Sequence, residues 1–110
     1  KTLAEIRQSI PEDCFTISPL RSWMTLIRIS SLLVFCLFLE AKTESLLLLI
    51  PVWLLHGQVL VGLFVLGHDC GHNSFSRSRL TNIIVGHAAF SPLGNGLINW
   101  TVTHNHHHAH

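Results

Sequence analysis

Two long apolar runs, separated by a short polar stretch, dominate the pattern of the sequence. Residues 23–39 contain a single charged side chain, Arg28, and residues 46–66 contain no Asp, Glu, Lys or Arg. A helix of about 20 apolar residues crosses the hydrocarbon core of a bilayer, and Arg28 is near enough to the start of its run for its long side chain to reach the headgroups. The pattern therefore predicts a transmembrane helical hairpin over 23–66, with its turn at 40–44.

The segment before the hairpin, residues 1–22, is more polar. Leu3, Ile6 and Ile10 recur at the spacing of one helix face, and Pro11 follows them. Because proline disfavours helical backbone at the residue before it, this segment predicts a short interfacial helix followed by a loop.

The segment after the hairpin, residues 67–110, contains eight of the nine histidines. Its stretch 83–100 is apolar but is broken by three glycines and a proline. Such a stretch is too interrupted for a third span, so we expect it in the membrane interface or as a partly buried re-entrant element. The expected fold class is all-α integral membrane, with a transmembrane hairpin followed by cytosolic or interfacial helices that carry the histidines.

The second apolar run also contains two polar side chains, His56 and Gln58. One interpretation is a hydrogen-bonded polar contact between helices. The other is that both side chains line a path for a substrate.

Positive charge indicates which side of the membrane the histidines face. A hairpin returns both flanking segments to one side, and the turn contains a single basic residue, Lys42, between two glutamates. The other basic residues lie in or near the flanks: Lys1, Arg7, Arg21, Arg28, Arg77 and Arg79. The positive-inside rule therefore places the histidine-rich segment on the cytoplasmic (or stromal) face of a multi-pass membrane protein.

Composition supports a membrane protein and excludes other classes. Charged residues make up 12% of the chain, and its mean hydropathy is +0.44. Ordinary soluble domains contain about 25% charged residues, and disordered chains are less apolar than this one. The formal net charge of +1 is too small for a nucleic-acid-binding surface, so no nucleic-acid partner is expected. Three cysteines at scattered positions favour free thiols over a disulfide framework.

The first group of candidate metal ligands is His68 and His72, directly after the second apolar run. If the helix continues past the membrane boundary, positions i and i+4 place both imidazoles on one face. Asp69 points off that face, where a hydrogen bond to a ligand imidazole suits it better than ligation. Taken alone, the pair is more typical of two surface or helix-end histidines that bind no metal.

The second group lies in the sequence His-Asn-His-His-His-Ala-His at the end of the chain. On a helix, His104, His107 and His108 share a face, whereas His106 points away. His106 and His110 form an alternative ligand set. A polyhistidine tract without function, or a purification tag, is the competing interpretation, although a tag is normally an unbroken run.

Both groups lie on the same predicted side of the membrane, and together they supply five imidazoles. Imidazole ligands suit zinc, copper, iron and nickel, so the ligand type does not select one metal. The sequence lacks H-E-x-x-H, and five histidines exceed the needs of a haem. The pattern indicates a nitrogen-rich site for more than one metal ion.

Several stretches resemble the membrane-bound fatty acid desaturases, within them the acyl-lipid Δ12/ω3 type of cyanobacteria and plastids. The matching stretches are residues 5–15 (EIRQSIPEDCF), 67–72 (GHDCGH), 74–79 (SFSRSR), 86–87 (GH) and 100–110 (WTVTHNHHHAH). The two histidine boxes with their flanks are specific to this family, whereas the transmembrane stretches are not.

The resemblance implies a four-helix membrane fold with a cytosolic cap and two iron ions held by three histidine boxes. It assigns His68 and His72 to the first box and the H-x-x-H-H group to the second, and it leaves His87 and His110 with uncertain supporting roles. The third box and the second pair of spanning helices are absent from these residues. We therefore expect an N-terminal fragment in which 67–110 is an incomplete histidine-box region, and which is inactive alone.

The resemblance also implies a reaction. Desaturases of this type use O₂ and two electrons to form a cis double bond in the acyl chain of a membrane glycerolipid. Their electron donor is ferredoxin in cyanobacteria and plastids, or cytochrome b5 elsewhere. A hydroxylase or ketolase with the same boxes is the alternative enzyme, and a non-catalytic histidine-rich protein that binds or transports metal is the alternative of another class.

Overall fold

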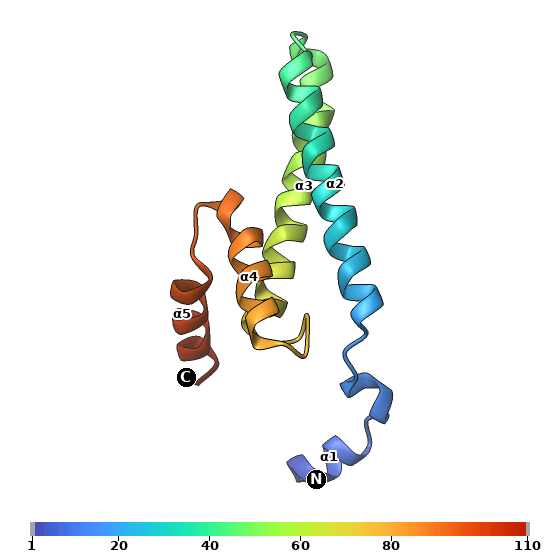
Figure 1. Ribbon diagram of the computed structural model, residues 1–110, viewed down its shortest axis with the longest axis vertical. Helices are drawn as coiled ribbons and strands as arrows, with labels where there is room; N and C mark the ends of the chain where they lie inside the picture. Colours follow the sequence, from blue (N-terminus) through green and yellow to red (C-terminus); the bar gives the residue numbers. More distant parts are fainter. Residues whose placement is uncertain (1, 110) are drawn as a thin grey trace.

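The computed structural model describes residues 2–109, which form helices and connecting loops without a strand (Figure 1). The molecule is elongated, with principal extents of 58 × 29 × 28 Å. The elements in chain order are α1 (Leu3–Gln8), η1 (Glu12–Phe15), α2 (Pro19–Lys42), α3 (Leu46–Gly71), α4 (Arg79–Phe90), η2 (Ser91–Leu93) and α5 (Leu97–Ala109). The expected all-α fold class is confirmed.

Helices α2 and α3 form an antiparallel hairpin that makes up the upper part of Figure 1. They contain 24 and 26 residues, so both are long enough and apolar enough to cross a membrane. Only 11% of the most apolar window of each helix is buried inside the protein. Such large exposed apolar surfaces require lipid or further helices around them, which supports a membrane protein.

Both helices extend beyond the apolar runs that predict them. The predicted turn at 40–44 is wrong at its start, because α2 continues to Lys42 and leaves only residues 43–45 as the connection. Its last turn is completed by a hydrogen bond from the Thr43 amide to the Leu39 carbonyl, 2.9 Å long. Glu40 is therefore a residue of the first spanning helix, not of the turn.

The interrupted stretch 83–100 forms separate elements. Helix α4 has 12 residues, which is too short for a span, and it packs along the lower half of α3 (Figure 1). Its fully buried Phe90 lies against Gly67 of α3. Gly94 then adopts a left-handed backbone with φ of +68°, and the chain reverses into α5. This reversal brings the second histidine group back beside the end of α3.

The loop between α3 and α4 is held by Asn82, a buried residue of α4. The Asn82 side chain accepts a hydrogen bond from the Ser76 amide at 3.0 Å and donates to the carbonyls of Ser76 at 2.7 Å and Ser78 at 2.9 Å. Phe75 of the same loop is buried and makes an edge contact with Trp23 of α2, with ring centroids 5.5 Å apart. The loop therefore ties α4 to both spanning helices.

The N-terminal segment begins with the expected short helix, α1, but the loop predicted after it contains the 3-10 helix η1. Thr2 and Glu5 form a reciprocal capping box at the start of α1, and this helix ends at Gln8, before Pro11. Its apolar side chains are exposed to the surroundings of the protein.

Candidate metal centre

The first histidine group lies at the lower end of α3. Helix α3 continues without a break to Gly71, which is the condition that the i, i+4 pairing of the two histidines required, and His72 caps it. Because they are four positions apart, His68 and His72 share one helix face, and their ring centroids are 4.6 Å apart. One helix, long and apolar enough to cross a membrane, thus carries both imidazoles at its end.

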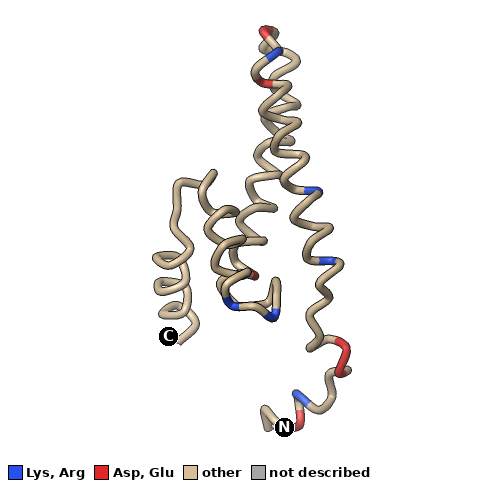
Figure 2. Tube along the Cα trace, viewed as in Figure 1, with Lys and Arg blue, Asp and Glu red and all other residues tan. Residues whose placement is uncertain are grey.

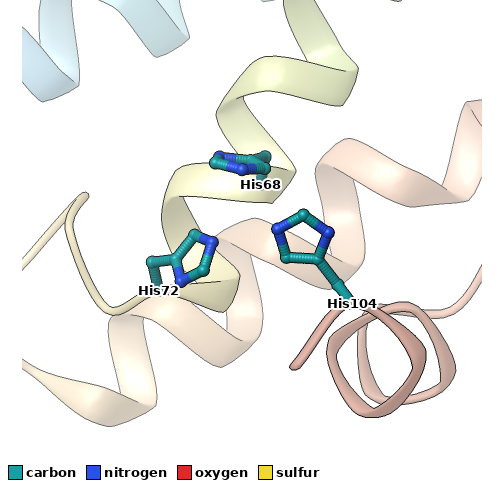
Figure 3. A group of neighbouring side chains, drawn as sticks. All are labelled: His68, His72 and His104. Atoms are coloured by element: carbon teal, nitrogen blue, oxygen red, sulfur yellow. The ribbon is translucent and has the colours of Figure 1, made fainter. Parts of the chain in front are cut away.

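Helix α5 adds a third histidine from a distant part of the sequence. The His104 ring centroid lies 5.0 Å from that of His68 and 5.1 Å from that of His72. One ligand nitrogen from each of the three residues lies within 4.8 Å of the others, and the side chains point toward a common centre (Figure 3). Nitrogens bound to one ion at about 2.1 Å are about 3 to 4 Å apart, so small side-chain adjustments would allow these three nitrogens to bind one ion.

His108 extends the group along α5. Its Nε2 lies 2.8 Å from the Nε2 of His104, which is a hydrogen-bond distance if one of the two nitrogens carries the proton. The His108 ring is also 5.4 Å from that of His72. His107 is farther away, with centroids 6.3 Å from His104 and 6.0 Å from His108. The structure therefore brings four of the five predicted ligands into direct contact and leaves His107 at the edge.

The other predicted site residues lie outside the three-histidine group. His87 is exposed on the last turn of α4, and His106 is exposed on α5. His110 lies outside the described residues. Asp69 lies beside the group, where its Oδ1 is 3.3 Å from the Nδ1 of His68.

The electrostatic environment favours neutral imidazoles. Burial, followed by the nearby imidazoles of His68 and His108, lowers the pKa of His72 against an opposing effect of Asp69. Burial and the four neighbouring histidines likewise lower the pKa of His104. Only the neutral ring binds a metal, so both shifts favour the form that acts as a ligand. If Asp69 accepts the proton of His68 Nδ1, the Nε2 atom of His68 is left for a metal.

The sequence pattern did not identify Trp100, which supports this group. Trp100 precedes His104 by one helical turn, and its ring stacks on the imidazole with centroids 4.2 Å apart. The available signal was the i, i+4 spacing, but this spacing alone does not distinguish a stacking residue from a core residue.

A second polar contact lies within the hairpin. The Nδ1 of His56 donates to the Oε1 of Glu40 at 2.7 Å, and both side chains are about three-quarters or more buried. Of the two interpretations of His56, this contact favours the one in which it joins two helices.

Comparisons with known proteins agree with this geometry. A family model described as "Fatty acid desaturase" matches residues 44–110. The chain is 44% identical over 106 residues to a Picosynechococcus protein named sn-1 oleoyl-lipid 12-desaturase, covering 96% of this chain and 30% of the relative. It is 38% identical over 108 residues to a Synechocystis protein named sn-1 acyl-lipid omega-3 desaturase (ferredoxin). That alignment covers 98% of this chain and 30% of the relative.

A plant relative is similar to the same degree. The Nicotiana tabacum protein named omega-3 fatty acid desaturase, endoplasmic reticulum, is 38% identical over 106 residues, covering 96% of this chain and 28% of the relative. The chain thus spans under a third of the length of these curated relatives. No solved structure matches it.

Proposed function

Since the chain belongs to the fatty acid desaturase family, we propose that the full-length protein introduces a cis double bond into the acyl chain of a membrane glycerolipid. The observation that carries the proposal is the meeting of two histidine groups at one end of an apolar hairpin. The names of the relatives, which specify acyl-lipid substrates, support it.

The proposed reaction converts two adjacent methylene groups into a cis alkene. The substrate gives up two electrons and two protons, an electron donor supplies two further electrons, and O₂ takes up all four electrons with four protons to form two molecules of water. Two irons bound by histidines supply the oxidant strong enough to break an unactivated C–H bond. The donor set fits iron, because imidazole nitrogen is one of its preferred ligands.

We assign the proposed iron ligands among the described residues to His68, His72, His104, His107 and His108. Four of these are clustered, and His107 reaches the site only by a change of side-chain rotamer or by a shift of α5. Asp69 orients His68 through the hydrogen bond to Nδ1. His87 and His106 are exposed and lie outside the cluster, so we assign neither as a ligand.

The hairpin orients the site toward the lipid substrate. In Figure 2 basic residues lie at the middle and lower part of α2 and in the loop before α4, whereas the tip of the hairpin carries one basic segment, from Lys42 at the end of α2, beside acidic ones. The positive-inside rule therefore supports a cytoplasmic or stromal site. An acyl chain enters such a site from the bilayer without passing through water.

The electron donor we propose is ferredoxin. Two of the similar proteins carry ferredoxin in their names, and both are cyanobacterial, as are several of the others. The plant relative is named for the endoplasmic reticulum, where cytochrome b5 is the alternative donor.

The test is to express the full-length protein in a host whose lipids contain both monounsaturated and diunsaturated acyl chains and to analyse the lipids by gas chromatography and mass spectrometry. An acyl chain with one additional cis double bond supports the proposal. A hydroxylated or keto product indicates the alternative oxygenase, and bound metal with no lipid product indicates a non-catalytic protein. His104→Ala should abolish the product, whereas His106→Ala should retain it. An inactive His106→Ala with an active His107→Ala would refute the ligand assignment.

A further inference from the structure

Trp100 contacts a histidine from each of the two groups. Its ring stacks on His104 of the same helix at an interplanar angle of 19° and a centroid separation of 4.2 Å. It also makes an edge contact with His68 of α3, at 5.3 Å and 64°. On its remaining sides it packs against Phe90 at 5.2 Å and Phe64 at 5.9 Å. The indole is thus held by the hydrophobic core and forms one wall of the histidine group.

Gly71 provides the space that Trp100 occupies. A Cβ atom at position 71 would lie 2.7 Å from Cζ3 and 3.3 Å from Cε3 of the Trp100 ring. The first distance is shorter than carbon atoms tolerate, so any larger residue would displace the indole. Gly71 lies between His68 and His72 on α3, and the absence of a side chain there is what allows α5 to bring its tryptophan against the helix.

We propose that Trp100 is a positioning residue for the metal centre, held in place by Gly71, and that the pair couples the geometry of the two histidine groups. This inference rests on the proposed metal-binding function. It adds a role for two residues that do not ligate metal, because neither an indole nor a glycine side chain offers a metal-binding atom here.

The physical argument concerns the orientation of His104. Its side chain must lose rotamer freedom to hold one nitrogen toward an ion. This loss of entropy lowers the metal affinity unless the side chain is already ordered in the metal-free protein. Stacking on a ring that is itself fixed by the core restricts the imidazole plane in the metal-free protein. Loss of partners that orient metal ligands typically weakens metal binding by about 10- to 100-fold.

The first test uses Co²⁺ as a spectroscopic probe. The full-length protein is purified in detergent, freed of metal and titrated with Co²⁺ while the visible absorption is recorded. Trp100→Leu should weaken Co²⁺ binding by about 10- to 100-fold and change the absorption band, which reports ligand geometry. The control is the same substitution at another tryptophan, Trp53→Leu. Trp53 lies in α3, and 50% of its surface is exposed. This variant should bind Co²⁺ within about threefold of the unaltered protein.

The second test isolates the contact with Gly71. Phenylalanine lacks the outer ring atoms Cζ3 and Cε3, so Trp100→Phe keeps an aromatic face while removing the atom nearest to a Cβ at position 71. The Thr101 Oγ1, 3.2 Å from that Cβ, is present in both backgrounds and does not affect the comparison. Gly71→Ala should therefore weaken Co²⁺ binding by about 10-fold or more when Trp100 is present, and by less than about threefold in the Trp100→Phe background. Circular dichroism of each variant checks that the helices are retained.

The outcomes separate this inference from the proposed function. If the unaltered protein binds no Co²⁺ and no iron, the proposed metal centre fails, and the inference fails with it. If the unaltered protein binds Co²⁺ and folded Trp100→Leu binds it equally well with the same spectrum, only the positioning role is refuted. Equal effects of Gly71→Ala in both backgrounds would refute the coupling through Gly71.

Discussion

The contact between Gly67 and Phe90 allows a quantitative test of the packing of α4 against α3. A Cβ atom at position 67 would lie 2.8 to 2.9 Å from three carbons of the Phe90 ring. Phe90 is fully buried, so its ring cannot move into solvent. Overpacking of this kind costs about 1–3 kcal/mol, because neighbouring side chains must leave their preferred rotamers or the helices must separate.

Gly57 of the same helix provides a matched control. A Cβ atom there meets nothing within 4 Å. Alanine favours a helix over glycine by about 1 kcal/mol at either position, so Gly57→Ala should stabilise the protein slightly. The difference between Gly67→Ala and Gly57→Ala therefore isolates the overpacking cost, about 1–3 kcal/mol, or about 5- to 150-fold in the unfolding equilibrium.

The assay is reversible unfolding of the full-length protein in mixed detergent micelles, followed by circular dichroism. Gly67→Ala should unfold at a lower fraction of denaturing detergent than Gly57→Ala, and adding Phe90→Leu to Gly67→Ala should recover part of the difference. Equal stability of the two glycine variants would refute the close approach of α4 to α3.

Three further predictions concern the hairpin and the loop. In vesicles, a cysteine at Thr43 and one at Ser76 should react from opposite sides of the membrane; labelling from one side would refute the hairpin. Glu40→Leu should destabilise the hairpin by about 0.6–1.7 kcal/mol, because it leaves His56 without its interhelical partner. Adding His56→Leu should reduce that loss of stability, because no unpaired polar group then remains. Unchanged unfolding of the single variant would contradict this. Asn82→Ala should lower the free energy of unfolding by about 1–3 kcal/mol and expose the preceding loop to proteolysis, whereas undiminished protease resistance would show that its three hydrogen bonds are dispensable.

The spanning helices were predictable because their signal is compositional. A run of apolar residues identifies a helix in lipid regardless of its neighbours, so both spans could be located from the sequence. The ends of α2 could not be located in the same way. Residues 40–42 are helical although two of them are charged. The helix ends with a hydrogen bond from the Thr43 amide, which cannot be inferred from the apolar pattern.

The candidate site was predictable only as far as spacing along one helix determines it. The i, i+4 rule placed His68 beside His72 and His104 beside His108, because both pairs lie on continuous helices. The same rule could not show that His107 lies farther out, since that depends on how α5 is rotated against α3. Trp100 was missed for the same reason: its role depends on a space at Gly71 in another helix.

The length of α3 explains where the first histidine group lies relative to the expected membrane surface. At about 1.5 Å per residue its 26 residues extend for about 39 Å, whereas the hydrocarbon core is about 30 Å thick. If the helix enters the core at Leu46, about six residues emerge on the other side, and His68 and His72 fall within or just beyond them. One uninterrupted helix thus fixes both the depth of the first histidine group and its rotation about the helix axis. Because each inserted residue would turn that group by about 100°, the span and the site cannot vary independently.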